Sequence, residues 1–144
     1  MHNIPDNNHV VRHCKKNWYD PTTNIVSIDV FKLRQNKIPQ EKDLSCFWFE
    51  FWGGDISKIE EDLLRVRNVH KNDKNILISI EKMKDIIKDY KSAYTIQAIH
   101  CGGTQNSYSK IYPNPVTIFN EEKLQGRLLE SIVKIYDIMK ISNK

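Results

Sequence analysis

The chain has 144 residues, of which 22 are Lys or Arg and 18 are Asp or Glu, so its formal net charge is +4. Hydrophobic residues make up 40% of it, which excludes an intrinsically disordered chain, and the small net charge gives no sign of a dedicated nucleic-acid-binding protein. The odd number of widely spaced cysteines, Cys14, Cys46 and Cys101, excludes a disulfide framework and favours reduced thiols in the cytoplasm.

The size of the chain predicts a single domain over residues 1–144. Its first eight residues are polar and include Pro5, so we expect residues 1–8 to be a flexible lead-in. They lack the basic and apolar regions of a secretory signal. The most apolar stretch, residues 44–52, is too short to span a bilayer, so we expect no association with a membrane.

The first half of the chain predicts strands separated by polar turns. β-Prone residues predict strands over residues 9–14 and 25–33, with a turn at 20–24 between them. In the first strand, alternation places Val11 and His13 on one face and Val10 and Arg12 on the other. Residues 44–52 are bulky on both faces, which predicts a central strand covered on both sides.

The second half predicts three helices. Asp55 is the expected N-cap of the first, whose buried face contains Ile56, Ile59, Leu63 and Val66. A strand over 76–80, a helix over 81–91 and a strand over 92–101 follow. A last helix is expected after Asn120, with an inner face made by Leu124, Leu128, Ile132, Ile135 and Met139, and with a close packing contact at Gly126.

This order of elements is typical of an α+β domain. We expect a single mixed β-sheet of about five strands with three helices packed on it.

Reactive side chains are concentrated in the first predicted strand at His9, Arg12, His13 and Cys14. An arginine can hold an anion and a histidine can act as an acid or base, which makes His9, Arg12 and His13 candidate catalytic residues. The alternative is ordinary packing, with Arg12 paired to a carboxylate.

A carboxylate, Glu50, falls within the apolar stretch over residues 44–52. A buried carboxylate is costly unless it is paired or protonated, so we expect Glu50 to meet a base, most plausibly Arg12. A desolvated Glu can also act as a general acid, and Glu50 is therefore a candidate catalytic residue, with Ser45 nearby as a candidate ligand contact.

A third candidate site lies at His100, where a predicted strand ends and a glycine loop begins. His100 is a candidate acid or base, and Gly102, Gly103, Thr104 and the nearby Tyr108 are candidate ligand-binding residues. The phosphate-binding pattern of nucleotide hydrolases is absent. No metal and no cofactor are expected, because the two His-Cys dipeptides can each offer only one ligand from a strand face.

Several segments resemble a group of small uncharacterised bacterial proteins. The resemblance is carried by His9-Val10-Val11-Arg12, by Phe31-Lys32-Leu33-Arg34, and by Leu44-Ser45 with Trp48 and Glu50. It covers most of the chain loosely and implies that His9, Arg12, Ser45 and Glu50 belong to one site. This chain has Tyr108 where the group has a histidine, which implies altered activity if that histidine is catalytic.

Two functions remain open from the sequence. The first is an accessory protein that binds a protein partner through its aromatic-rich segment, because no complete catalytic motif is present. The alternative is an enzyme acting on a nucleotide, a nucleic acid or another phosphorylated ligand, in which Arg12 holds the anion, a histidine moves the proton and Glu50 orients it. Plain nucleic-acid binding is a third, less supported possibility.

Overall fold

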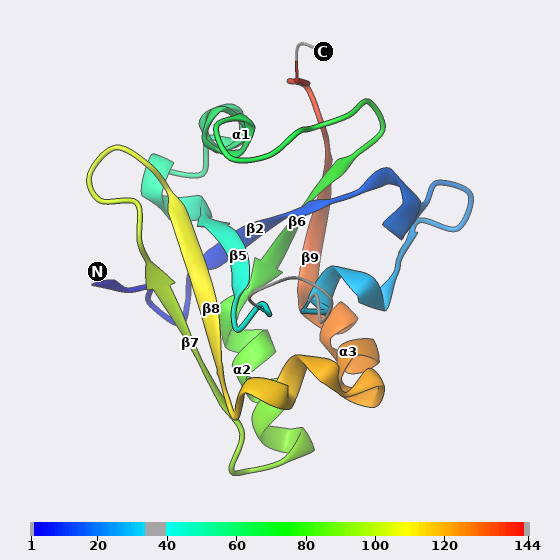
Figure 1. Ribbon diagram of the computed structural model, residues 1–144, viewed down its shortest axis with the longest axis vertical. Helices are drawn as coiled ribbons and strands as arrows, with labels where there is room; N and C mark the ends of the chain where they lie inside the picture. Colours follow the sequence, from blue (N-terminus) through cyan, green and yellow to red (C-terminus); the bar gives the residue numbers. More distant parts are fainter. Residues whose placement is uncertain (1, 34–39, 143–144) are drawn as a thin grey trace.

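A seven-stranded antiparallel sheet dominates the computed structural model, which describes residues 2–33 and 40–142 (Figure 1). The strand order is β1-β7-β8-β5-β2-β6-β9. The strands are β1 (His2–Asn3), β2 (His9–Cys14), β5 (Leu44–Trp48), β6 (Lys74–Ser79), β7 (Thr95–His100), β8 (Tyr108–Asn114) and β9 (Ile132–Asp137). The α+β class is confirmed, but the expectation of a mixed sheet of about five strands is wrong, because every pairing among these strands is antiparallel.

Three α-helices lie on the two faces of this sheet (Figure 1). Helices α2 (Ile80–Tyr90) and α3 (Glu122–Leu128) cover the larger core, which contains Val10. Helix α1 (Ile56–Leu64) covers the smaller core, which contains Val11 and Phe47. The predicted alternation of the two valines between faces is confirmed. The predicted N-cap is also confirmed, since the Asp55 side chain accepts a hydrogen bond from Ser57 N.

The amino-terminal residues are part of the sheet rather than a flexible lead-in. Strand β1 pairs with β7, and Ile4 N donates to Ala98 O at 2.9 Å. The Ile4 side chain is only 3% exposed. The segment is held by this backbone pairing and by the buried Ile4 side chain. A single apolar residue among polar neighbours gave no signal of this in the sequence.

Two predicted strands end early in 3-10 turns. The stretch over 25–33 contributes only β4 (Ile25–Val26), which pairs with β3 (Tyr19–Asp20), and then enters η2 (Ile28–Phe31). The stretch over 44–52 leaves the sheet after β5 and forms η3 (Phe49–Trp52), which Gly53 ends at φ +65°. A left-handed conformation of this kind favours glycine, so Gly53 is suited to end η3.

The last predicted helix is the largest error. Helix α3 ends at Leu128, and after a turn, η5 (Leu129–Ser131), the chain becomes β9, which pairs with β6. Ser131 Oγ donates to Leu128 O at 2.6 Å within this turn. The apolar residues after Leu128 fit a helical period, but the open edge of β6 offered them backbone partners instead.

Smaller features also differ from the prediction. Asn120 belongs to η4 (Val116–Asn120), and α3 is instead preceded by Glu121 as its N-cap. Val66 lies beyond α1 and is 53% exposed, so it is not part of the buried face. A Cβ built on Gly126 would meet no atom within 4 Å, so the expected close contact is absent there.

Candidate functional site

The sheet opens between its two middle strands, β5 and β2. β2 pairs with β6 along its whole length, but with β5 only at Val10–Trp48 and Val11–Phe47. Beyond these pairs the strands diverge (Figure 1). The backbone of β5 before Phe47 therefore faces a gap rather than a neighbouring strand.

The side chain of Arg12 occupies this gap. Its Nε donates to Val30 O at 2.8 Å, and one terminal nitrogen donates to Ser45 O at 2.6 Å. Desolvation lowers the Arg12 pKa from 12.5 to about 10, so the guanidinium stays charged at neutral pH. Arg12 thus joins η2 to β5 and places a positive charge at the floor of the gap.

A cleft of about 400 Å³ lies over this charge. Four cationic residues line it, namely Arg12, Lys15, Lys32 and Arg67. Three acidic residues, Asp29, Glu41 and Asp43, also line it. Asp29 accepts from Ser27 Oγ at 3.1 Å, and Asp43 lies 3.9 Å from Lys110 Nζ. The four cations outnumber the three acids, and this small excess of positive charge suits an anionic ligand.

His13 also lines the cleft and is held by a buried carboxylate. Its Nε2 lies 2.8 Å from Asp73 Oδ2, and the two side chains are only 7% and 2% exposed. Asp73 also accepts from His70 N and Lys16 N, each at 2.9 Å. Burial raises the Asp73 pKa, but the hydrogen bonds from His70, His13 and Lys16 outweigh it and leave the pKa below its ordinary value.

The protonation state of this pair follows from these contacts. Asp73 is ionised at neutral pH and can only accept, so His13 Nε2 must donate. Desolvation lowers the His13 pKa from its ordinary value, which favours the neutral ring. Within the described residues no hydrogen bond reaches His13 Nδ1. A neutral histidine oriented by a carboxylate is the arrangement of a proton acceptor.

Glu50 meets a base, but the base is His9 rather than Arg12. Glu50 Oε2 lies 2.6 Å from His9 Nδ1, and Glu50 Oε1 accepts from His9 N at 2.8 Å. Both side chains are nearly a third exposed. Glu50 belongs to η3 and not to a strand, so its side chain is not deeply buried and does not need a guanidinium as its partner. Residues His9 and Glu50 are not among those that line the cleft.

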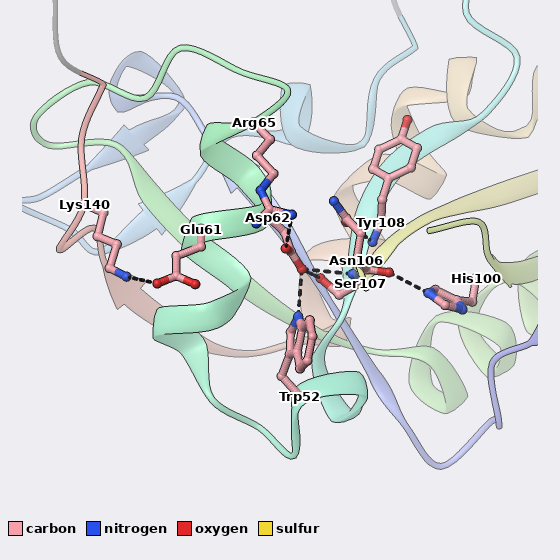
Figure 2. Close-up of polar contacts among 9 residues, drawn as sticks. All are labelled: Trp52, Glu61, Asp62, Arg65, His100, Asn106, Ser107, Tyr108 and Lys140. Carbon is pink, nitrogen blue, oxygen red and sulfur yellow. Dashed lines mark hydrogen bonds and ion pairs between the residues drawn. The ribbon is translucent and has the colours of Figure 1, made fainter. Parts of the chain in front are cut away.

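His100 lies in an aromatic cluster, and it does not line the cleft that contains Arg12. Its ring centroid is 5.3 Å from that of Trp48 and 4.6 Å from that of Phe51, and its Nε2 donates to Asn106 O at 2.7 Å. Figure 2 shows this contact beside the return of the chain into β8. Arg12, Glu50 and His100 are thus not brought together in one cleft.

The glycine loop after His100 folds on itself. A Cβ on Gly102 would lie 2.1 Å from Asn106 O, and Gly103 has φ +67°. At the end of the loop, Asp62 Oδ2 accepts from Ser107 Oγ at 2.6 Å and from Trp52 Nε1 at 2.8 Å (Figure 2). The glycines therefore meet the needs of a tight turn, and Gly102, Gly103 and Thr104 do not line the cleft.

Ser45 and Tyr108 lie on neighbouring strands. Ser45 lines the cleft, and its Oγ lies 3.3 Å from the Tyr108 hydroxyl. The Tyr108 ring packs edge-on against Phe47, with centroids 5.7 Å apart. Of the residues that suggested a resemblance in the sequence, Arg12, Lys32, Leu33, Leu44 and Ser45 line the cleft, whereas His9 and Glu50 form a separate pair. Arg34 lies outside the described residues.

The cysteines do not offer a nucleophile to this cleft. Desolvation raises the pKa of both Cys14 and Cys46 to about 12, which suppresses their thiolates. Cys101 is half-buried and is not a cleft residue. In the part of the chain that the structure describes, no three His, Cys, Asp or Glu residues are grouped so that they could hold a metal ion.

Sequence reasoning missed several residues of this region. Asp73, which holds His13, was part of a polar loop, and the cleft residue Arg67 followed a helix, so neither carried a periodic signal. Lys15 was visible only as part of a basic pair with Lys16, and the turn of the chain after β2 brings Lys15 to the cleft.

No protein-family model, no curated protein and no solved structure matches this chain. Among the described residues, no helix is both long and apolar enough to cross a membrane.

Proposed function

We propose that the protein binds a phosphorylated small molecule in the cleft between β2 and β5. The observation that carries this proposal is the Arg12 guanidinium, which lines the cleft together with Lys15, Lys32 and Arg67. Cations beside a partly desolvated site attract phosphate more strongly than cations in open water. The cleft volume of about 400 Å³ falls in the range of small-molecule sites.

His13 adds a chemical role to this proposal. Its Nδ1 would accept a proton from a ligand hydroxyl or from water, while Asp73 holds the ring and stabilises the imidazolium that results. The site of the expected enzyme would then be made by Arg12 and His13. Neither Glu50 nor His100, the other proposed members, is a cleft residue.

The accessory-protein hypothesis stays a prediction. Its motivation was the absence of a complete catalytic motif together with the aromatic residues over 47–52. An exposed patch of these residues would support it, but Phe47 is buried and Trp52 is half-buried, with its Nε1 bonded to Asp62. The large apolar side chains that are exposed among the described residues lie on different elements: Ile25, Val66, Val116, Val133, Met139 and Ile141.

Calorimetric titration at low salt tests the proposal. The ligands are inorganic phosphate, AMP, ADP and ATP, with adenosine as the uncharged comparison. We expect the phosphorylated ligands to bind and adenosine not to bind. Lys32→Ala and Arg67→Ala should each weaken binding about tenfold, since a charge-assisted hydrogen bond contributes about 1.5 kcal/mol or more.

Lys88→Ala is the matched control, because Lys88 is an exposed lysine on α2 and does not line the cleft. Its affinity should equal that of the wild type. Failure of every phosphorylated ligand to bind at millimolar concentration, with all variants folded, would contradict the proposal.

A further inference from the structure

A second hollow adjoins the cleft on the other side of His13. It has a volume of about 590 Å³, and it shares His13, Lys15 and Arg67 with the cleft. Because three residues line both hollows, the two hollows are neighbours with these side chains between them.

The second hollow carries a positive charge of its own. Lys16, which is exposed, lines it together with the shared Lys15 and Arg67, and the exposed His70 lines it as well. Its one carboxylate, Asp73, is 2% exposed and already accepts hydrogen bonds from three donors. The cations outnumber the accessible acids in this hollow, so it favours negative charge more clearly than the cleft does.

The positive side chains are shared out between the two hollows: Lys32 and Arg12 line the cleft, Lys15 and Arg67 line both, and Lys16 lines the second hollow. A single phosphate can contact only some of them. A ligand with several phosphates could contact more of them, and each neutralised phosphate would add affinity through the release of counterions.

An aromatic side chain lines the cleft beside these charges. Trp18 is half-buried, and Lys15 Nζ lies 5.2 Å from its ring centroid. Unpaired bases stack on such rings, whereas the bases of a duplex are already stacked on one another. A cleft with a tryptophan in its wall and cations along its length suits a single strand.

We propose that the cleft and the second hollow together bind single-stranded nucleic acid, with one nucleotide in the cleft and the following phosphates along Lys15, Arg67 and Lys16. This inference rests on the proposed binding of phosphorylated ligands in the cleft. It names single-stranded nucleic acid as the ligand, and it gives the second hollow the role of binding further phosphates.

Binding of a length series tests the inference. The probes are 5′-phosphorylated thymidine, oligothymidylates of two, four and eight nucleotides, oligouridylates of the same lengths, and an eight-base-pair duplex. Affinity is measured by competition against a fluorescent oligonucleotide and by calorimetry. We expect affinity to rise at least tenfold between one and four nucleotides, and the slope of log affinity against log salt to steepen by about 0.7 for each added phosphate contact.

Variants in the second hollow separate the two proposals. Lys16→Ala combined with His70→Ala should abolish the gain from length while mononucleotide affinity stays at the wild-type value. Both changes keep the backbone N–H groups that donate to Asp73. Trp18→Leu should weaken the binding of all oligonucleotides, and Lys88→Ala should change nothing.

Three other outcomes of the length series would contradict one or both proposals. If mononucleotides bind and added length brings no affinity, this inference is overturned and the proposed function stands. Binding of the duplex as tightly as the single strand would also overturn it. If no phosphorylated probe of any length binds, both proposals fail.

Discussion

The guanidinium of Arg12 donates to the carbonyl of Ser45 at 2.6 Å, at the point where β2 and β5 have ceased to pair. A side chain from one strand thus satisfies a backbone acceptor of the next strand across the opening. With its second bond to Val30 O, Arg12 closes the gap and leaves a charge in the cleft. The same residue therefore supports the fold and the candidate site.

Arg12→Lys should destabilise the protein. A lysine has no planar fork and cannot donate to Val30 O and Ser45 O with the same geometry, so at least one acceptor loses a charged partner. We expect the free energy of unfolding to fall by about 2 kcal/mol, measured by urea denaturation. Lys88→Ala, far from the cleft, should stay within about 0.5 kcal/mol of the wild type. An equally stable Arg12→Lys protein would refute this role of Arg12.

The pH dependence of stability should depend on His13. Its pKa lies below the ordinary value of 6.5 in the folded protein, so the unfolded chain binds the proton more readily. The free energy of unfolding should therefore fall as the pH drops below about 6.5, and the loss should level off below the folded pKa.

A comparison with His13→Gln isolates this contribution, because glutamine can still donate to Asp73 but does not titrate. The difference in the free energy of unfolding between the two proteins should shrink or reverse as the pH is lowered from 8 to 5, measured by urea denaturation at each pH. Asp73, whose pKa lies below 3.8, adds a separate loss at more acidic pH in both proteins. Parallel pH curves for both proteins would rule out a buried neutral His13.

The three thiols should react in two groups. Cys14 and Cys46 have pKa values raised to about 12, and both are buried, whereas Cys101 is half-buried. With an aromatic disulfide reagent at pH 8, we expect one thiol to react in the native protein and all three after denaturation. Cys101→Ser should remove the native reaction. Rapid reaction of the remaining thiols in that variant would contradict the burial of Cys14 and Cys46.

Two glycine substitutions should have opposite effects. Gly126 lies in α3, and an added Cβ would meet no atom within 4 Å, so Gly126→Ala should stabilise the protein by up to about 1 kcal/mol. Gly102→Ala would place a Cβ 2.1 Å from Asn106 O and should destabilise it. Thermal melts of both variants test the pair. A lower melting temperature for Gly126→Ala would mean that the helix needs a glycine there for another reason.

Much of the candidate site depends on contacts that leave no recognisable pattern in the neighbouring sequence. The concentration of reactive side chains in one predicted strand made Arg12 and His13 candidates, Arg12 as an anion holder and His13 as an acid or base. It gave no indication that Arg12 would bond to backbone carbonyls, because a backbone acceptor leaves no trace in the residue pattern. Asp73 was equally hidden, since its role depends on a loop that packs beside the end of β2.

The sequence by itself determined the α+β class, the cap at Asp55 and the alternation of Val10 and Val11 between two cores, because these depend on propensities and periods of neighbouring residues. Tertiary structure decided that residues 132–137 extend the sheet instead of a helix, and that Glu50 pairs with His9. It also decided the opening between β2 and β5. Such outcomes follow from which backbone and charged groups meet across the fold, and partners distant in the chain are not encoded by any local pattern.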